Sequence, residues 1–321
     1  MNGNKKYYLT FDGGGNKLKV IVYDSELNIL GRAKSGGVNG LAFTDEEVRA
    51  HMKEAVTEVM KQAGSPKLSE ASGVLIGSSD FMKAELTAHG CDEVRFLGEG
   101  HGCLLSALLD TRGAVALSGT GATMYYITPE REVTRGGFGA RIGDEGSGYY
   151  IGEHGIRAGI RMLDGWGEET MLGQLLREYT HSVPGKGHNI FGYFYTKEDP
   201  TPMHMKIASF THCVETACNA GDRIALEIVR DAGSKIAMQM LSLLSQVNAP
   251  DDIGIAMCGG AWKTSPEMER VFREVMASER PNNKIYRSLL EPVTAGAVDM
   301  LSRRGRLEAE RDKLLENFKN M

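Results

Sequence analysis

The hydrophobic pattern at the start of the chain predicts a small antiparallel meander. Residues 6–11 form an apolar strand-like run, residues 12–17 contain three consecutive glycines, and apolar side chains alternate with their neighbours over residues 18–22. Alternation of this kind on both sides of a glycine-rich turn is typical of a β-hairpin. A further turn signal precedes residues 29–33, which are expected to add a third strand.

The next segments predict helices alternating with strands. Thr44 and Glu47 have the spacing of a capping box, and apolar residues then recur at helical spacing from Val48 to Ala63. Strands that alternate with helices indicate a sheet with a parallel portion. The expected elements that follow are a strand over 73–76, a helix over 81–89, a strand over 94–97 and a short helix over 104–110.

Residues 114–127 repeat the plan of the first hairpin, with an apolar strand, a small-residue turn at 118–121 and an alternating strand. The two turns are about 105 residues apart. Such a repeat predicts a duplicated lobe whose two turns face each other across a cleft.

Beyond Gly146 the periodicity is mainly helical. The expected helices cover residues 149–162, 168–179, 205–219, 223–247 and 266–277, with one strand at 253–257 between them. The charged tail at 303–319 is expected to form a solvated terminal helix.

The length of 321 residues exceeds what one hydrophobic core usually supports, so two lobes of an α/β fold are expected. The expected boundaries are residues 1–113 for the first lobe and 114–299 for the second. A C-terminal helix over about 300–321 is expected to return to the first lobe.

Charge and composition narrow the range of functions. The net charge is −5 with no long basic run, which argues against a nucleic-acid partner. The N-terminus does not read as a signal peptide, and no apolar stretch has the length of a membrane span, so we expect a cytoplasmic protein without a membrane partner. The five cysteines have no metal-binding or disulfide spacing and are expected to be buried, reduced thiols.

The glycine clusters are the candidate ligand-binding segments. In Asp12–Lys17 (DGGGNK), backbone amides can converge on phosphate oxygens, and the aspartate can hold the water shell of a magnesium ion. A strand rather than a helix follows this turn, and the GK[ST] ending is missing, so it is neither a Rossmann fingerprint nor a P-loop. Taken alone, it could be an ordinary hairpin turn.

Two further clusters strengthen the phosphate interpretation. Ser118–Gly121 (SGTG) offers a hydroxyl and amides at the matching place in the second hairpin. Gly259 and Gly260 follow a strand and precede a helix, where backbone can pack against an adenine ring, although this could also be a plain strand-to-helix turn.

The order of two phosphate-type hairpin turns and a late GG turn resembles that of the actin, sugar kinase and Hsp70 class of ATPases. The block RGGFG followed by GDEGSGYYIG, residues 135–152, is similar to the sugar-side segment of N-acetylglucosamine kinases and of the BadF/BadG/BcrA/BcrD-type ATPases. The similarity extends from Asp12 to the PVTAGA turn. It implies two ribonuclease H-like lobes with a cleft between them, the second lobe rich in helices.

The resemblance also implies roles for individual residues. The ATP phosphates and Mg²⁺ would be held by Asp12, Gly13, Gly14, Gly15, Asn16, Lys17, Gly119, Thr120 and Gly121, with Asp12 as the metal residue. Adenosine would contact Gly259, Gly260 and Trp262. The sugar would contact Asn39, Phe138, Gly139, Asp144 and Glu145. Asp144 could also be an N-cap of the helix that follows it.

Two positions depart from the family pattern. Glu99 stands where the family places the aspartate that acts as catalytic base, so its carboxylate is one methylene further out. Asn16 replaces the threonine of the usual DGGGT turn, which removes a hydroxyl but keeps a hydrogen-bond donor.

The resemblance therefore implies an ATP-dependent kinase that phosphorylates a small sugar, N-acetylglucosamine or glucosamine, and forms a homodimer. Two alternatives stay open at this point. One is an ATP-driven activator of a redox system, which would need paired cysteine ligands for a shared iron–sulfur cluster. The other is a non-catalytic nucleotide or sugar sensor, in which Glu99 and Asn16 mark the loss of the chemistry.

Overall fold

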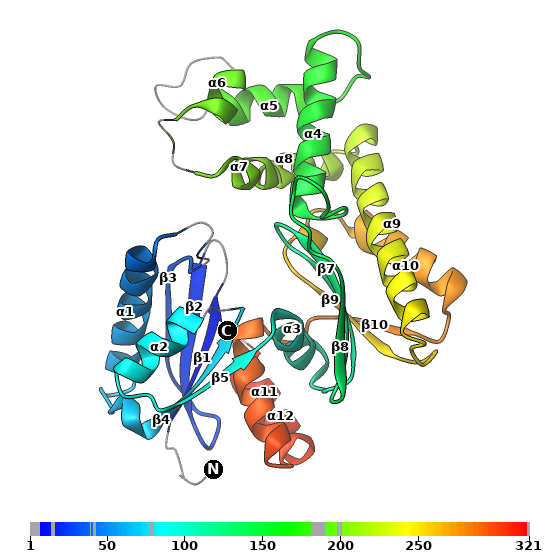
Figure 1. The fold of residues 1–321 in the computed structure, drawn as a ribbon. Helices are drawn as coiled ribbons and strands as arrows, with labels where there is room; N and C mark the ends of the chain where they lie inside the picture. Colours follow the sequence, from blue (N-terminus) through cyan, green and yellow to red (C-terminus); the bar gives the residue numbers. More distant parts are fainter. Residues whose placement is uncertain are drawn as a thin grey trace. The chain divides into compact units, whose positions relative to one another are not determined.

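The computed structural model describes residues 7–13, 17–38, 40, 43–77, 80–181, 190–197, 199 and 201–319. It contains two compact units (Figure 1). The first unit comprises Met1–Thr111 together with Arg287–Met321, and the second comprises Arg112–Tyr286. No helix among the described residues is both long enough and apolar enough to cross a membrane.

The first unit is built on a five-stranded sheet in the order β3-β2-β1-β4-β5. The three N-terminal strands pair antiparallel, whereas β4 is parallel to β1 and β5 is parallel to β4. Both the predicted meander and the predicted parallel portion are confirmed. The strands are β1 (Tyr7–Gly13), β2 (Lys17–Asp24), β3 (Ile29–Gly36), β4 (Ala71–Ile76) and β5 (Glu93–Leu97).

Helices cover both faces of this sheet because successive strand side chains point to opposite sides. Leu9 and Phe11 pack in the core beneath α1 (Asp45–Gln62) and α2 (Asp80–Ala88). Tyr8, Ile21 and Tyr23 belong to a second core. The helices over that core are α3 (Glu99–Leu108), α11 (Ala295–Arg303) and α12 (Leu307–Phe318), and the short turns η1 (Leu68–Glu70) and η3 (Pro292–Thr294) complete the unit.

The predicted capping box of α1 is present. The Glu47 amide donates to the Thr44 hydroxyl at 3.3 Å, and the Thr44 amide donates to the Glu47 carboxylate at 2.8 Å. These reciprocal bonds satisfy amides that the first turn of a helix leaves without partners.

The expectation of a solvated C-terminal tail was wrong for one face of α12. Leu314 and Phe318 are fully buried in the first unit, and the Phe318 ring packs edge-on against Tyr23 with centroids 5.6 Å apart. The tail is rich in charged residues, but Leu314 and Phe318 are four residues apart, a spacing that puts both on one face of the helix.

The sheet of the second unit has the order β10-β9-β6-β7-β8, which repeats the strand order of the first sheet. The hairpin strands β6, β7 and β8 are antiparallel, and β9 is parallel to β6, as β4 is to β1. The predicted duplication is therefore confirmed at the level of topology. The strands are β6 (Gly113–Ser118), β7 (Ala122–Thr128), β8 (Arg131–Gly136), β9 (Gly254–Cys258) and β10 (Lys284–Arg287).

The helices of the second unit are more divided than the periodicity predicted. The segment expected as one helix over 205–219 breaks at Phe210, which is fully buried, and the helix expected from 168 begins at Leu172. The elements are α4 (Gly148–Leu163), α5 (Leu172–His181), α6 (Ile190–Tyr195), α7 (Met203–Ser209), α8 (Thr211–Asn219), α9 (Arg223–Gln246), η2 (Ala261–Lys263) and α10 (Pro266–Glu279).

One face of α4 consists of glycines that allow neighbouring helices to touch its backbone. A Cβ atom placed on Gly152 would lie closer than 3.0 Å to the Ile207 carbonyl of α7, and one on Gly159 would lie 2.8 Å from the Leu172 carbonyl of α5. Because a backbone carbonyl cannot move aside as a flexible side chain can, these positions admit no side chain.

We expect Gly152→Ala to lower the free energy of unfolding by roughly 1–3 kcal/mol, because overpacking outweighs the better helix propensity of alanine. Urea denaturation measures this change. Gly40→Ala is the control, since a Cβ there meets nothing within 4 Å. Equal stability of the two variants would contradict the close packing of α4 on α7.

Candidate functional site

Asp12 lies near the end of β1, where it is opposite Lys19 of β2 in the strand register. Burial raises the pKa of this carboxyl group from 3.8 to about 6, although the positive charge of Lys19 opposes the rise. The negative charge of Glu99 adds to it. A carboxylate held in this way gains from a nearby cation, which would replace the water that it has lost.

Glu99 is the first residue of α3 and directly follows the loop after β5. The helix begins five residues before the predicted start, so Glu99 is part of a helix N-terminus and not of an isolated loop. Its side chain is exposed, and the positive end of the helix dipole favours a negative charge there. Asp12 is paired with Ile76 of β4, which is paired with Leu97 of β5, so Asp12 and Glu99 lie at the same edge of the sheet.

Sequence reasoning missed two residues of this cluster, Lys19 and Glu291. Their side chains form an ion pair, and both charges act on the Asp12 carboxyl group. The hairpin register could have identified Lys19 as the partner of Asp12 on the neighbouring strand. Glu291 gave no such signal, because it approaches from a segment 272 residues further along the chain than Lys19.

The cluster fits magnesium bound together with a nucleotide better than a metal held by protein alone. The described residues contain no group of three or more His, Cys, Asp or Glu side chains that could hold a metal ion. Magnesium usually keeps several waters and takes one or two carboxylates plus substrate phosphates. The single half-buried carboxylate of Asp12 is suited to that arrangement.

Gly14, Gly15, Asn16 and Asn39 lie outside the described residues. Their predicted neighbours Gly13 and Lys17 are described, as the last residue of β1 and the first residue of β2.

The second turn, Ser118–Gly121, closes with a hydrogen bond from the Gly119 amide to the Gly121 carbonyl at 2.9 Å. Within the part of the chain that the structure describes, the amides of Thr120 and Gly121 donate to no backbone carbonyl. Thr120 is exposed and Gly121 is partly exposed. These two amides are therefore the donors that the turn can offer to an anion.

Three hydrogen bonds join this turn to the start of α4. The Ser118 hydroxyl donates to the Gly146 carbonyl at 2.8 Å, the Gly148 amide to Gly119 at 2.7 Å, and the Tyr149 amide to Thr120 at 3.2 Å. The SGTG and GDEGSGYY motifs, which the sequence singled out separately, therefore form one structure.

Asp144 lies directly behind the second turn. It is buried and has a φ of +62°, and a Cβ on Gly121 would come within 2.7 Å of its Oδ2. Burial raises the pKa of this carboxyl group, and hydrogen bonds from the backbone of Ala122 and Gly139 lower it. Its Oδ1 has no hydrogen-bond partner among the described residues. Because a buried oxygen without a donor is costly, Oδ1 is an acceptor available to a ligand hydroxyl.

The alternative role of Asp144 as a helix N-cap was wrong. The cap of α4 is Ser147, whose hydroxyl accepts the amide of Tyr150 at 3.1 Å. Asp144 is three residues before the cap, in a left-handed conformation that the turn imposes.

The other residues expected on the sugar side are exposed on the same loop of the second unit. Phe138 is 72% exposed, and Gly139 and Glu145 are also exposed. Gly139 has a φ of +84°, which glycine adopts readily.

The third glycine cluster packs against the second turn. Gly259 has a φ of +100°, and a Cβ there would lie closer than 3.0 Å to the Ser118 carbonyl. Gly259 and Gly260 are exposed. Trp262 is buried instead, and its indole N–H donates to the carbonyls of Cys258 at 3.0 Å and Ala116 at 3.2 Å. Exposed surface for an adenine ring is thus provided here by glycine backbone.

A model of the BadF/BadG/BcrA/BcrD ATPase family matches residues 11–298. Among curated proteins, the chain is similar to an N-acetylmuramic acid/N-acetylglucosamine kinase of Clostridium acetobutylicum, with 27% identity over 91% of this chain and 97% of the relative. It is also similar to glucosamine kinase GspK of Vibrio cholerae, with 22% identity over 88% and 98%, and to an N-acetyl-D-glucosamine kinase of Dictyostelium discoideum, with 23% identity over 92% and 98%.

Solved structures show the same fold. A Chromobacterium violaceum protein superposes with a TM-score of 0.69 at 19% identity, covering 93% of this chain and 100% of its own. A ROK family glucokinase from Streptomyces griseus in complex with glucose and AMPPNP superposes with a TM-score of 0.60 at 13% identity, covering 92% and 99%. The predicted α/β fold of the actin-like ATPase type is confirmed.

The buried carboxyl group of Asp12 predicts a pH-dependent stability in metal-free, nucleotide-free protein. Its pKa of about 6 in the folded state exceeds the ordinary value of 3.8, so the fold binds this proton more tightly than the unfolded chain does. Proton binding by Asp12 therefore stabilises the folded state fully below about pH 4, and this stabilisation is lost as the pH rises through 6. We therefore expect Asp12→Asn to be more stable than the native protein at pH 7.5, by on the order of 2 kcal/mol, and not at pH 4.

Urea denaturation at the two pH values, in the presence of a chelator, measures this difference. Asp252→Asn, at an exposed position, should show no such change. A stability difference between Asp12→Asn and native protein that is the same at both pH values would contradict the effect of burial.

Proposed function

Because the chain belongs to the BadF/BadG/BcrA/BcrD ATPase family, we propose that it is an ATP-dependent sugar kinase that phosphorylates a hydroxyl of N-acetylglucosamine or glucosamine. Three curated relatives carry the names of kinases for these sugars or for N-acetylmuramic acid, and each is matched over nearly its whole length. The phosphoryl group would come from the γ-position of ATP.

The observation that carries this proposal is that Asp12 and Glu99 lie at the same edge of the first sheet, where β1, β4 and β5 run parallel. Phosphoryl transfer to an alcohol needs a group that holds the metal of the nucleotide and a carboxylate that accepts the proton of the attacking hydroxyl. Asp12, half-buried and short of solvent, is suited to the first task. Glu99, exposed at a helix N-terminus, is suited to the second.

The nucleotide would be held by backbone from both hairpin turns. We assign the phosphates to Gly13–Lys17 and to Gly119–Gly121, where the amides of Thr120 and Gly121 are available donors. Magnesium, bound with the phosphates near Asp12, would neutralise charge that develops on them. Adenosine would lie on Gly259 and Gly260, with the buried Trp262 supporting that turn from beneath.

The sugar would be bound by the loop that precedes α4. Asp144 supports this assignment because its Oδ1 is buried and has no partner among the described residues. We assign the remaining contacts to Asn39, Phe138, Gly139 and Glu145. In the reaction, Glu99 would accept the proton of the sugar hydroxyl, the hydroxyl oxygen would form a bond to the γ-phosphorus, and the bond from that phosphorus to the bridging oxygen would break, so that ADP leaves.

Cysteine burial disfavours the redox activator. Four of the five cysteines are buried and Cys213 is half-buried. Burial raises the pKa of the Cys213 and Cys218 thiols to about 11, whereas cluster ligands are thiolates.

We further propose that the kinase acts as a homodimer in the cytoplasm. The second unit exposes several large apolar side chains, among them Ile142 at 82% and Trp166 at 68%. Exposed apolar surface of this kind often marks an interaction site.

We expect Glu99→Gln to lower kcat by about 10²–10⁴-fold, because the amide cannot accept the proton, while ATP binding is retained. Coupled ADP detection with N-acetylglucosamine and glucosamine measures the rate, and thermal shift with ATP and magnesium measures binding. Glu308→Gln, at an exposed position of α12, is the control. Activity left intact in Glu99→Gln would remove Glu99 from the mechanism. If the sugar stabilises the native protein but is not phosphorylated, the result would favour a sensor.

Gly121→Ala and Gly119→Ala form a matched pair in the second turn. The new Cβ at position 121 would lie 2.7 Å from Asp144 Oδ2, whereas one at position 119 meets nothing within 4 Å. We expect Gly121→Ala to lower kcat/KM for the sugar by roughly 10²-fold by displacing the Asp144 carboxylate, and Gly119→Ala to have a small effect. Equal losses in the two variants would contradict a role for the contact between Gly121 and Asp144.

A further inference from the structure

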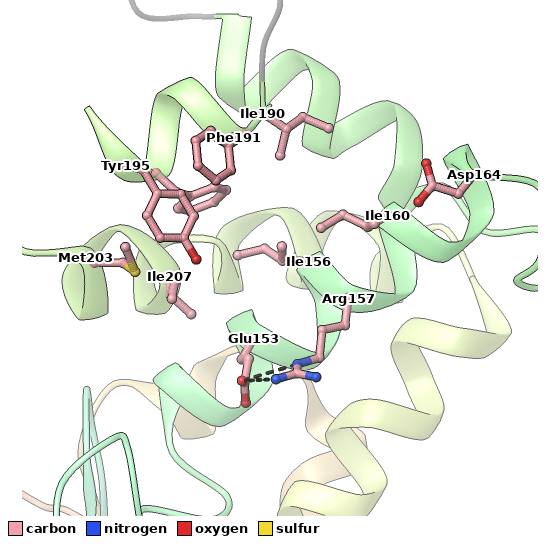
Figure 2. A pocket seen from close by; sticks show the side chains of 11 residues that line it. Glu153, Ile156, Arg157, Ile160, Asp164, Ile190, Phe191, Tyr195, Met203 and Ile207 are labelled. Atoms are coloured by element: carbon pink, nitrogen blue, oxygen red, sulfur yellow. Dashed lines mark hydrogen bonds and ion pairs between the residues drawn. The ribbon is translucent and has the colours of Figure 1, made fainter.

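Two pockets, one in each unit, have volumes typical of small-molecule binding sites. The pocket of the second unit, of 410 Å³, lies between α4, α6 and α7 (Figure 2). Two of its charged lining residues, Glu153 and Arg157, neutralise each other through an ion pair at 2.8 Å. The pocket of the first unit, of 360 Å³, differs because most of its charge is positive and unpaired.

The pocket of the first unit, here called the basic pocket, lies between the strands β2 and β3 and the segment that contains η3. Its lining includes three basic side chains, one carboxylate and two buried apolar residues of the second core. In that order, these residues are Lys19, Arg32, Lys34, Glu291, Ile21 and Val293. The proposed phosphoryl transfer assigns no role to Arg32 or Lys34.

The strand register puts the three basic side chains on one face of the sheet. Lys19 is paired with Lys34, and residues paired across two strands point to the same side. Two residues along β2, Ile21 is paired with Arg32 on that same side. The opposite face of β3 is covered by α1, since a Cβ on Gly31 would lie 2.7 Å from a backbone carbonyl of that helix. The side chains of Arg32 and Lys34 therefore point away from α1 and toward the basic pocket.

The positive charge of the basic pocket is only partly neutralised. The Glu291 carboxylate forms an ion pair with Lys19. The side chains of Arg32 and Lys34 form no ion pair or hydrogen bond with any residue that the structure describes. The three basic groups and one carboxylate therefore leave a net charge of +2. Because like charges directly opposite each other destabilise a sheet, an anion between Lys19 and Lys34 would be stabilising.

Protection of a sheet edge does not explain all three charges. Basic side chains on an edge strand often prevent pairing with another chain, and β3 is an edge strand. Lys19, however, lies on β2 inside the sheet, and its side chain is only 13% exposed. An ammonium group that has lost most of its water needs several hydrogen-bond acceptors, and Glu291 supplies one carboxylate. A bound anion would supply further acceptors.

We propose that the basic pocket binds a phosphoryl group, either as free phosphate or as part of a small phosphate monoester, at a site separate from that of ATP. The guanidinium of Arg32 can donate two parallel hydrogen bonds to such a group, and Lys19 and Lys34 add ammonium donors. A phosphoryl group carries a charge of about −2 near pH 7, which balances that of the pocket. A single carboxylate would balance only half of it.

The basic pocket is close to Asp12 but does not coincide with it. Asp12 is paired with Lys19, and Lys19 is paired with Lys34, so the three residues form one row across the sheet. Neighbouring strands are about 4.8 Å apart, which puts Lys34 roughly 10 Å from Asp12. A phosphoryl group at Arg32 and Lys34 can therefore be bound together with nucleotide phosphates near Asp12.

Three variants test the basic pocket by changing one charge each. Lys34→Gln and Arg32→Gln each remove a positive charge, and Glu291→Gln removes the negative charge. Lys53→Gln, at an exposed position of α1 outside the pocket, is the matched control. Calorimetry on protein saturated with AMPPNP and magnesium gives the affinity for inorganic phosphate, for glycerol 2-phosphate and for the monoanion acetate. A separate titration gives the affinity for ATP with magnesium.

We expect both phosphates to bind the nucleotide-loaded native protein, and acetate to bind about tenfold more weakly or less. Lys34→Gln and Arg32→Gln should each weaken phosphate binding by about tenfold, as loss of a charged hydrogen bond does. Glu291→Gln should tighten it, because the net positive charge rises. Lys53→Gln should leave it within about twofold, and the affinity for ATP should change by no more than that in Lys34→Gln and Arg32→Gln.

The two phosphates distinguish the sources of the ligand. Equal affinities would identify free phosphate, and tighter binding of glycerol 2-phosphate would identify a monoester; either result supports the site. Failure of both phosphates to bind, or acetate binding as tightly as they do, would overturn the proposal. It would also be overturned if Lys34→Gln and Arg32→Gln weaken ATP binding as much as phosphate binding, since the pocket would then belong to the nucleotide site.

Discussion

The hydrogen bonds between the second turn and the start of α4 are the constraint on which the second unit depends. Ser118, Gly119 and Thr120 each make one of these bonds to the segment Gly146–Tyr149. Each such bond contributes only about 1 kcal/mol net, but breaking one leaves a buried polar group without a partner. No side chain fits at Gly259, which packs on the Ser118 carbonyl from the other side. The turn is therefore fixed by backbone on two sides, and its remaining amides have a defined direction.

The two units share a backbone plan but differ in the side chains that surround their glycine-rich turns. Their sheets share one strand order, and each carries a glycine-rich hairpin turn with an acidic residue beside it. In the first unit Asp12 is surrounded by charges, with Lys19, Glu99 and Glu291 as neighbours. In the second unit Asp144 is held by backbone hydrogen bonds and has one unpartnered oxygen among the described residues. Duplication thus preserved the backbone plan, and the side chains around each turn diverged.

The sequence predicted the features that depend on local pattern. Both hairpins, the capping box at Thr44 and Glu47, and the long helix α9 follow from periodicity and turn residues. The sequence did not predict the features that depend on tertiary packing. The strands β8 and β10 are short and mostly polar edge segments with little apolar alternation, and Leu314 and Phe318 are buried within a charged helix. In the site, the assembly of SGTG with GDEGSG and the approach of Glu291 to Lys19 depend on long-range contacts that no local pattern encodes.

The first unit takes its core from both ends of the chain, and this determines the order in which the protein can fold during synthesis. Tyr23 packs with Phe318, and Ile21 shares its core with Val298 and Leu301. The second unit is continuous from Arg112 to Tyr286, so all of its residues leave the ribosome before the last segment of the first unit is translated. Until α11 and α12 are made, only α3 covers that face of the sheet that carries Asp12, so part of its apolar surface stays exposed in the nascent N-terminal half.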